Sequence, residues 1–207
     1  MTTSALPDPA LPLFPLQSVL FPGGLLALKI FEARYLDLMS RCLREQRPFG
    51  VVALRSGGES RVSRQAVAMH EVGTLAELID VDSPEANILL VRCRGTQRFR
   101  LDGARQESDG LWLGNATALA DDPEVAPNAT HGNVVKSLSD SIDALSAQGA
   151  DPFLTPHRFD DAGWVANRWC EILPLPLDAK QRLMALEDPV ARLDIVDSLM
   201  RAKQSSH

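Results

Sequence analysis

Four arginines lie close together, at a spacing that could build a binding surface. They are Arg92, Arg94, Arg98 and Arg100. The first two fall on one predicted strand, 88–94, and the last two on another, 96–102, which Gly95 could join into a hairpin. Side chains two residues apart on a strand face the same side of a sheet, so all four could form one basic stripe. The stripe could contact an acidic peptide, a nucleic-acid backbone or a partner protein, or it could be a solvated face with acidic neighbours.

Nucleic acid is the weaker of these partners. The formal net charge of the 207-residue chain is −6, whereas binding to phosphates needs concentrated positive charge. Phe99 is the one aromatic residue among the arginines, and on a strand it would point to the other face. A stacking platform for single-stranded nucleic acid is therefore not expected.

A second candidate surface is apolar. Phe21 and Pro22 stand in a turn that Gly23 and Gly24 complete, and Phe31 follows the apolar run 25–30. Exposed at a loop tip, Phe21, Pro22 and Phe31 could contact an apolar partner. The alternative is that they pack against the end of the strand-rich core.

The motifs of common enzymes are missing from the sequence. It has no GxxxxGK[ST] phosphate loop, no GxGxxG after a strand, no HExxH and no GxSxG. Cys42, Cys93 and Cys170 are far apart and form no CxxC pair, so neither a zinc nor a redox motif is written. His70 and Glu71 are neighbours on a predicted strand and would point to opposite faces. We therefore expect no catalytic residues, no cofactor and no metal site.

The elements that must position the candidate residues are mostly short strands. Leu11–Gln17 contains Pro12 and Pro15, which predicts an edge or irregular strand because proline donates no hydrogen bond. An amphipathic helix is predicted over 32–46, and a flexible loop over 55–64. The other predicted strands are 25–30, 49–54, 66–72, 74–81, 88–94, 96–102 and 111–118.

Helices follow a polar segment that contains prolines, 121–128. One apolar stripe begins at Val134, and a second helix is predicted over 160–173. Asp178 is predicted to cap a short third helix, with Gln181 completing a capping box, and Asp188 with Pro189 to start a fourth. Strands followed by helices predict an α+β fold, with domains at 11–120 and 131–204.

Several segments, in order, resemble one known family, the N-terminal substrate-binding domain of Lon proteases in its stand-alone bacterial form. The opening segment, 13–23, leads into 28–35. A second hallmark is similar to His70–Leu78, a third to Ile88–Arg100, and the helical signature of the family to Asp178–Leu193. The match in order and spacing extends over roughly residues 11–200, and ordered motifs are more specific than any single one.

The resemblance implies a PUA-like β pseudo-barrel of about six strands plus one helix, followed by a C-terminal helical bundle. It also implies a non-catalytic module that binds unfolded or degron-bearing polypeptides, acts as an adaptor in protein quality control and has a protease as partner. The ATPase and the Ser–Lys protease of the family are expected to be absent, because the chain ends at His207. The alternative is a PUA-like nucleic-acid-binding protein.

The N-terminal segment and the hydropathy of the chain bear on where it resides. Residues 1–10 are polar with two prolines and lack the basic and apolar regions of a signal peptide. No apolar stretch approaches the roughly 18 residues of a membrane helix. We therefore expect a cytoplasmic protein without a membrane partner; the sequence predicts no oligomeric state.

Overall fold

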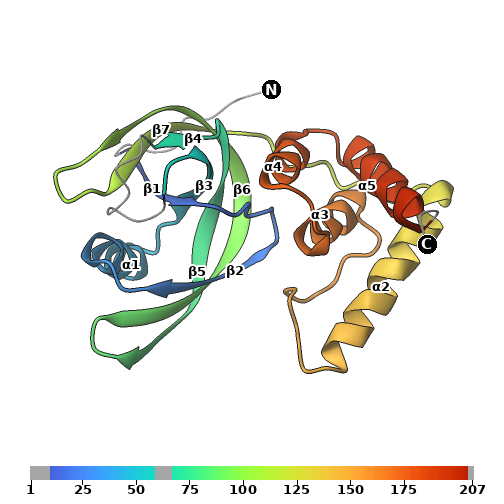
Figure 1. Ribbon diagram of the computed structural model, residues 1–207, viewed down its shortest axis with the longest axis horizontal. Coiled ribbons are helices and arrows are strands. Elements are labelled where there is room, and N and C mark those ends of the chain that lie inside the picture. The colour runs from blue at the N-terminus through green and yellow to red at the C-terminus, as the bar shows by residue number, and fades with distance from the viewer. Residues whose placement is uncertain (1–9, 59–66, 205–207) are drawn as a thin grey trace. The chain divides into compact units, whose positions relative to one another are not determined.

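The structure is a computed structural model, and it describes residues 10–58 and 67–204. The chain divides into two compact units, which meet in the sequence at Asp121 and Asp122 (Figure 1). We call them the strand unit and the helix unit and describe each by itself. The predicted domain limits, 11–120 and 131–204, stay a prediction. Part of the predicted loop 55–64 and the start of the predicted strand 66–72 lie outside the described residues.

The strand unit contains a seven-stranded sheet and one α-helix among its described residues, and the chain as a whole is α+β as predicted. The α-helix, residues 33–45, confirms the helix that the apolar periodicity predicts over 32–46. The elements are β1 (Leu11–Leu16), β2 (Leu25–Ile30), α1 (Ala33–Glu45), β3 (Phe49–Ser56), β4 (Ala68–Met69), β5 (Val72–Glu85), β6 (Ile88–Gln106) and β7 (Trp112–Ala118).

One continuous strand, β6, replaces the predicted hairpin at Gly95. This glycine is not a turn residue but a point of close approach between β6 and the loop that joins β1 to β2. Its carbonyl accepts from the Gly23 amide at 2.8 Å, and its amide donates to the Gly24 carbonyl at 2.9 Å. A Cβ at position 95 would collide with the Phe21 carbonyl oxygen. A glycine is therefore needed here because two backbone segments pack closely together. Local sequence signals alone suggest a turn at the same position.

The strands β1, β7, β6, β5 and β3 form a closed circuit, because β1 pairs with both β7 and β3. The prediction that residues 11–17 form an edge or irregular strand holds only in part: β1 belongs to the circuit, but each of its neighbours pairs with only part of it. β7 pairs with Leu11–Leu13 and β3 with Leu13–Leu16, so β1 has two neighbours at Leu13 alone. Pro12 and Pro15 each lie where one side of β1 has no partner among the described strands, and a missing N–H is tolerated there.

The sheet has an apolar core on each face. On one face, Tyr35, Leu38 and Met39 of α1 pack against the strands, and the rings of Phe14 and Tyr35 stack with centroids 4.0 Å apart. On the other face, enclosed by the circuit, the fully buried Phe99 packs with residues of β1, β3 and β5. Both faces of this sheet are therefore used for stability over most of its length.

Arg34, a charged residue in the first turn of α1, is buried. Its Nη1 donates to the Gly110 carbonyl at 2.6 Å, and its Nη2 lies 2.9 Å from a carboxylate oxygen of Glu32. The guanidinium also lies 4.5 Å from the centre of the Tyr35 ring. A buried cation with this many partners ties the start of α1 to the turn before β7.

The helix unit is built of helices that local signals predict well. Asp188 Oδ1 accepts from the amides of Val190 and Ala191, at 2.9 and 3.1 Å, which confirms the predicted cap. The predicted cap at Asp178 is wrong: Pro176 holds that position, and Asp178 lies in the first turn. The helices are α2 (Gly132–Ser146), α3 (Ala162–Ile172), α4 (Leu177–Ala185) and α5 (Pro189–Gln204), with a short 3₁₀ turn at Ala129–His131.

The core of the helix unit surrounds α3. Trp164 and Trp169 are buried, and Trp169 Nε1 donates to the Val134 carbonyl of α2 at 3.0 Å. Two arginines, Arg168 and Arg192, are also buried in this unit, which the sequence does not suggest. No helix among the described residues has the length and apolarity that a bilayer crossing requires.

Candidate functional site

The four arginines of β6 do not form one stripe. Arg98 pairs with Thr74, and Gly95 pairs with Ala76. Between these two pairs, β6 advances by three residues and β5 by two, which is a β-bulge. One extra residue reverses which side chains face which side. Cys93 accordingly belongs to the core under α1, and Phe99 to the core on the opposite face. Arg92 and Arg94 therefore lie on one face of the sheet, and Arg98 and Arg100 on the other.

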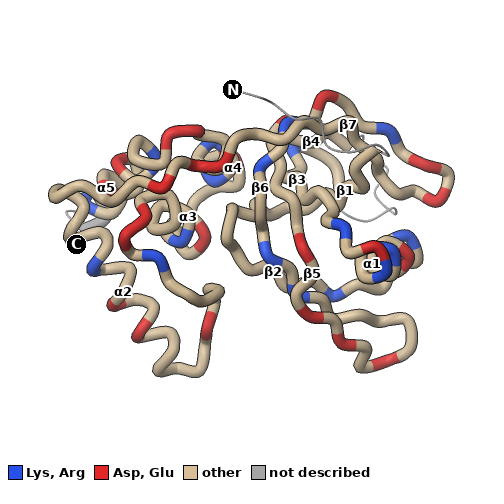
Figure 2. The backbone as a smooth tube through the Cα atoms, turned by 180° about the vertical axis from the view of Figure 1, so that it is seen from behind, with Lys and Arg blue, Asp and Glu red and all other residues tan. Residues whose placement is uncertain are grey.

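The environments of these arginines differ as well. Arg98 is buried, and its Nη2 lies 3.5 Å from the Ala120 carbonyl oxygen. Arg94 forms an exposed ion pair with Glu77 across the strands, at 3.0 Å. Arg92 and Arg100 are exposed. Figure 2 shows basic residues on β6 beside acidic residues on the neighbouring β5. This mixed pattern differs from the uniform basic surface that binds phosphates.

The three apolar candidates, Phe21, Pro22 and Phe31, differ in their exposure. Phe21 is fully buried, so the prediction that it is an exposed contact is wrong; its carbonyl accepts from the Gly24 amide in a tight turn. Pro22 is half-buried. Phe31, directly after β2, is 66% exposed, the largest exposure among the described large apolar residues. Phe31 is thus the predicted apolar contact that is available to a partner.

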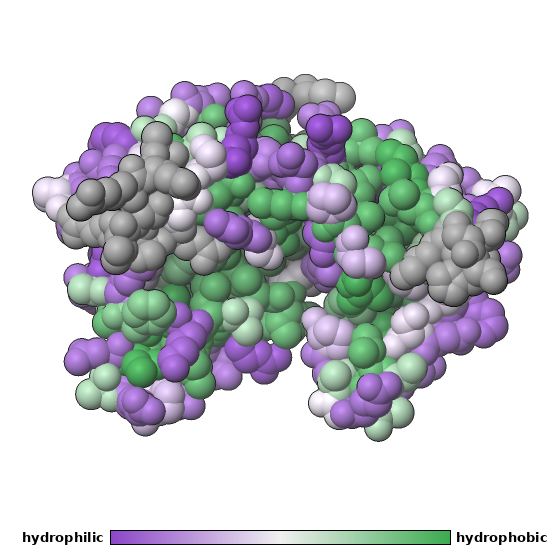
Figure 3. All heavy atoms as spheres, in the orientation of Figure 1, coloured by the Kyte–Doolittle hydropathy of each residue, from purple (hydrophilic) through white to green (hydrophobic). Residues whose placement is uncertain are grey.

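An exposed surface surrounds Phe31 and the outward face of β2. The register places Lys29 of β2 beside Leu90 of β6, and Ala27 beside Arg92. Leu90 is 42% exposed, and Ala27, Lys29 and Arg92 are exposed too. Figure 3 shows hydrophobic residues at the surface near the place of β2 in Figure 1. We call Phe31, Lys29, Leu90 and Arg92 the β2 surface.

Sequence reasoning missed Lys29 and Leu90. Leu90 stands in the uninterrupted apolar run of residues 88–91, where no alternation shows which side chain faces outward. Only the folded sheet shows that Leu90 lies beside Lys29, on the exposed face of β2 and β6. Lys29 is one of four lysines in the chain and has no local motif around it.

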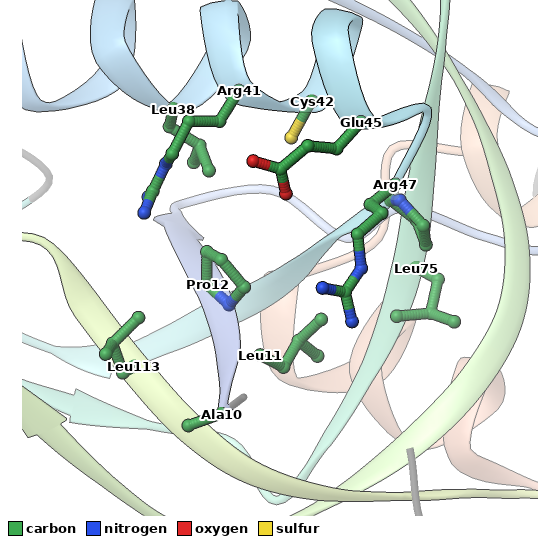
Figure 4. Close-up of a pocket in the computed structure, with 11 residues that line it drawn as sticks. Ala10, Leu11, Pro12, Leu38, Arg41, Cys42, Glu45, Arg47, Leu75 and Leu113 are labelled. Atoms are coloured by element: carbon green, nitrogen blue, oxygen red, sulfur yellow. The ribbon is translucent and has the colours of Figure 1, made fainter. Parts of the chain in front are cut away.

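A pocket of about 300 Å³ opens in the strand unit between α1 and the start of β1 (Figure 4). Arg41, Glu45 and Arg47 stand over it, and Figure 4 shows the carboxylate of Glu45 between the two guanidinium groups. A pocket of this size and lining can hold one apolar side chain. Its apolar lining consists of Ala10, Leu11, Pro12, Leu38, Pro48, Leu75 and Leu113.

Cys42 lines the same pocket but is no nucleophile. Burial raises the pKa of its thiol to about 11, so that the group stays protonated at neutral pH. In the helix unit, His131 Nε2 lies 2.7 Å from Asp194 Oδ1, with no third ionisable partner in the described contacts. Within residues 10–58 and 67–204, no three or more His, Cys, Asp or Glu residues are placed to hold a metal ion.

A family model matches nearly the whole described chain. The model of the ATP-dependent protease La (LON) substrate-binding domain matches residues 10–202. The chain is similar to the Lon protease of Paraburkholderia phytofirmans, with 28% identity over 94% of this chain and 24% of the relative. Lon protease 2 of Myxococcus xanthus is 27% identical over the same shares. The chain thus spans about a quarter of the length of the curated relatives that it matches.

Solved structures agree with the family match. The crystal structure of a Lon N-terminal domain protein from Xanthomonas campestris superimposes with a TM-score of 0.74 and 31% identity, and covers 92% of this chain and 98% of the other. The N-terminal domain of the Mycobacterium avium complex Lon protease has a TM-score of 0.59 over 91% of this chain and 96% of the other. Its 13% identity makes the second likeness one of fold alone.

Proposed function

Because the chain belongs to the family of ATP-dependent protease La (LON) substrate-binding domains, we propose that it recognises polypeptides and catalyses no reaction itself. The observation that carries the proposal is the family match, which covers nearly all of the chain, residues 10–202. The buried, protonated thiol of Cys42 is consistent with a module that binds without reacting.

The expected clients are unfolded or degron-bearing polypeptides. Such chains expose apolar side chains that a folded protein buries, and exposed apolar patches mark sites that bind them. The strand unit offers two places of this kind. The pocket under Arg41 and Arg47 has room for one apolar side chain, and Phe31 and Leu90 lie exposed on the β2 surface.

The finer expectations are part of the same proposal. We propose that the closed circuit of strands corresponds to the PUA-like pseudo-barrel that the family resemblance implies, and that α2 to α5 correspond to the C-terminal bundle. The chain acts as an adaptor in protein quality control, in the cytoplasm, and passes its clients to a protease partner. Three buried free cysteines suit a reducing compartment.

Nucleic acid is not favoured as a ligand. The bulge in β6 divides the four arginines between two faces, Arg98 is buried and Arg94 is paired with Glu77. The net charge of −6 adds a general repulsion of phosphates.

The test compares the folded and the unfolded form of one small protein as ligands. A small disulfide protein is labelled with a fluorophore, and half of it is reduced and carboxymethylated so that it stays unfolded. Anisotropy titrations with the purified chain should show binding of the unfolded form, with a dissociation constant of roughly micromolar order, and none of the folded form. Equal failure with both forms, or binding of a labelled RNA alone, would contradict the proposal.

A matched pair of variants connects binding with the surface. Phe31→Asp should weaken binding of the unfolded form. Ile195→Asp changes an exposed apolar residue of α5 that is 44% exposed, and should leave binding unchanged. Equal affinity of both variants and the wild type would remove Phe31 from the site.

A further inference from the structure

β2 has a free edge within the strand unit. Over its six residues, Leu25–Ile30, it pairs with β6 and with no other described strand. Edge strands usually carry a proline, a bulge or several charges that discourage pairing with another chain. β2 has no proline, its register with β6 is regular, and Lys29 is its one charged residue.

The register decides which backbone groups of β2 face this edge. In an antiparallel pair, residues that exchange hydrogen bonds alternate with residues that do not. The Gly95 amide donates to the Gly24 carbonyl, so these two opposite residues are a hydrogen-bonded pair. The residues of β2 that bond to β6 therefore follow Gly24 at steps of two, and are Leu26, Leu28 and Ile30. The N–H and C=O groups of Leu25, Ala27 and Lys29 therefore point away from β6, toward the free edge.

The side chains at this edge define what would fit. Lys29 and Arg92 are exposed, and the register places Lys29 beside Leu90 and Arg92 beside Ala27. Beside them stand the exposed Leu90 and Phe31. On the opposite face of β2, Leu26 and Leu28 already pack against the core under α1. A strand laid along the edge would thus meet two cations on the face of Lys29 and Arg92, and the partly buried Leu26 and Leu28 on the other face.

We infer that β2 binds an extended segment of the client as an additional strand of the sheet, and that it prefers segments that alternate acidic and apolar side chains. The inference rests on the proposed function and specifies its binding mode and ligand class. Main-chain hydrogen bonds to Leu25, Ala27 and Lys29 supply affinity that is independent of sequence. Acidic side chains two residues apart face Lys29 and Arg92 together, and supply the preference.

Substitution of one residue separates backbone from side-chain effects. Ala27→Pro removes an N–H that faces the free edge and no hydrogen bond to β6. Ala27→Val, the matched control, adds similar bulk and keeps the N–H. The probe is a labelled peptide of alternating aspartate and valine, titrated by anisotropy. We expect Ala27→Pro to weaken binding roughly 5- to 10-fold, the effect of one lost hydrogen bond, and Ala27→Val to bind like the wild type.

Main-chain hydrogen bonding between the peptide and β2 can also be tested by changing the peptide and leaving the protein unchanged. The same peptide with N-methyl groups on alternate backbone nitrogens should lose binding to the wild type. This measurement decides the question if Ala27→Pro fails to fold. The preference is tested with Lys29→Glu, which should weaken binding of the aspartate peptide and strengthen binding of its lysine counterpart.

The outcomes distinguish this inference from the function on which it rests. If the unfolded protein binds while Ala27→Pro and the methylated peptide bind as well as their controls, the strand inference is wrong and the function stands. If neither peptide nor unfolded protein binds the wild type, the function itself fails. If the wild type dimerises, Ala27→Pro is monomeric and client binding is unchanged, a second copy occupies the edge, and the inference is also wrong.

Discussion

Arg192 Nη1 lies 2.6 Å from Asp122 Oδ2, which joins the first residue of the helix unit to its last helix. The arginine is 1% exposed. Its Nε also donates to the Leu183 carbonyl at 2.8 Å, and its Nη1 to Asn167 Oδ1 at 3.1 Å. A buried cation with one acid and several neutral acceptors holds the start of the unit, α3, α4 and α5 together.

Asp122→Ala should destabilise the helix unit by about 3 kcal/mol, because it leaves the buried charge of Arg192 without its acid. Urea unfolding followed by the fluorescence of Trp164 and Trp169 measures the change. Glu124→Ala is the control: Glu124 pairs with Arg158 at the surface, and its loss should change the free energy of unfolding by about 0.5 kcal/mol or less. Equal effects of the two variants would contradict the structural role of Asp122.

Glu171 should make the stability of the helix unit depend on pH. Burial raises the pKa of its carboxyl from 4.5 to about 7, against the opposing effects of Arg168 and Lys180. Between these values the folded state holds a proton that the unfolded state has lost, so stability falls as pH rises from about 4.5 to 7. Unfolding free energies measured at pH 5 and pH 7 should therefore differ less in Glu171→Gln than in the wild type. An unchanged difference would show that Glu171 does not titrate in this window.

Filling the pocket under α1 should weaken client binding without loss of the fold. Leu113→Trp places a larger side chain in the apolar lining, where a client side chain would enter. We expect about a threefold or greater loss of affinity for an unfolded ligand, measured by anisotropy. Ala104→Trp, at an exposed position of β6, is the control and should bind normally. Identical affinities would show that clients do not use the pocket.

The three thiols should be inert in the native protein. Burial raises the pKa of Cys42 to about 11, and those of Cys93 and Cys170 to about 12. Because the thiolate is the reactive form, a coloured thiol reagent at pH 8 should modify all three rapidly in denaturant and none rapidly without it. Fast reaction of one thiol in the native protein would reveal local opening of that part of the core.

Gly95→Ala should destabilise the strand unit by about 2 kcal/mol or more, since the added methyl group collides with the backbone at Phe21. Thermal unfolding by circular dichroism measures the effect. Gly132→Ala in α2 is the control, because nothing lies within 4 Å of its added Cβ, and it should be neutral or slightly stabilising. A stable Gly95→Ala variant would mean that the β1–β2 loop can move away from β6.

Local chemistry explains which parts of the fold could be predicted. The Asp188–Pro189 start of α5 and the apolar periodicity of α1 depend on residues within a turn of each other, and both predictions are confirmed. The α+β order and the family likewise follow from segments read along the chain. Asp178 shows the limit even there, because Pro176 takes the position before the helix.

The failures depend on residues far apart in the chain. Arg34 is buried because the Gly110 carbonyl accepts its hydrogen bond, and no pattern near residue 34 signals this. The arginines of β6 separate because of a bulge set by pairing with β5. Phe21 is buried because its turn packs on Gly95. The candidate surface was therefore only partly predictable: the exposure of Phe31 and Arg92 could be foreseen, but not their grouping with Lys29 and Leu90.

The position of β1 in the closed circuit has a consequence for how the protein is made. Leu11 pairs with Gly114, about 100 residues later, and contacts so distant in sequence form slowly. During synthesis, the parallel pairing of β1 with β3 can form as soon as residue 53 has emerged from the ribosome, whereas the circuit has to wait for β7. Until then β1 and β6 present unpaired backbone to the cell. A nascent chain that stalls in this interval would itself have the exposed strand edges that quality control recognises.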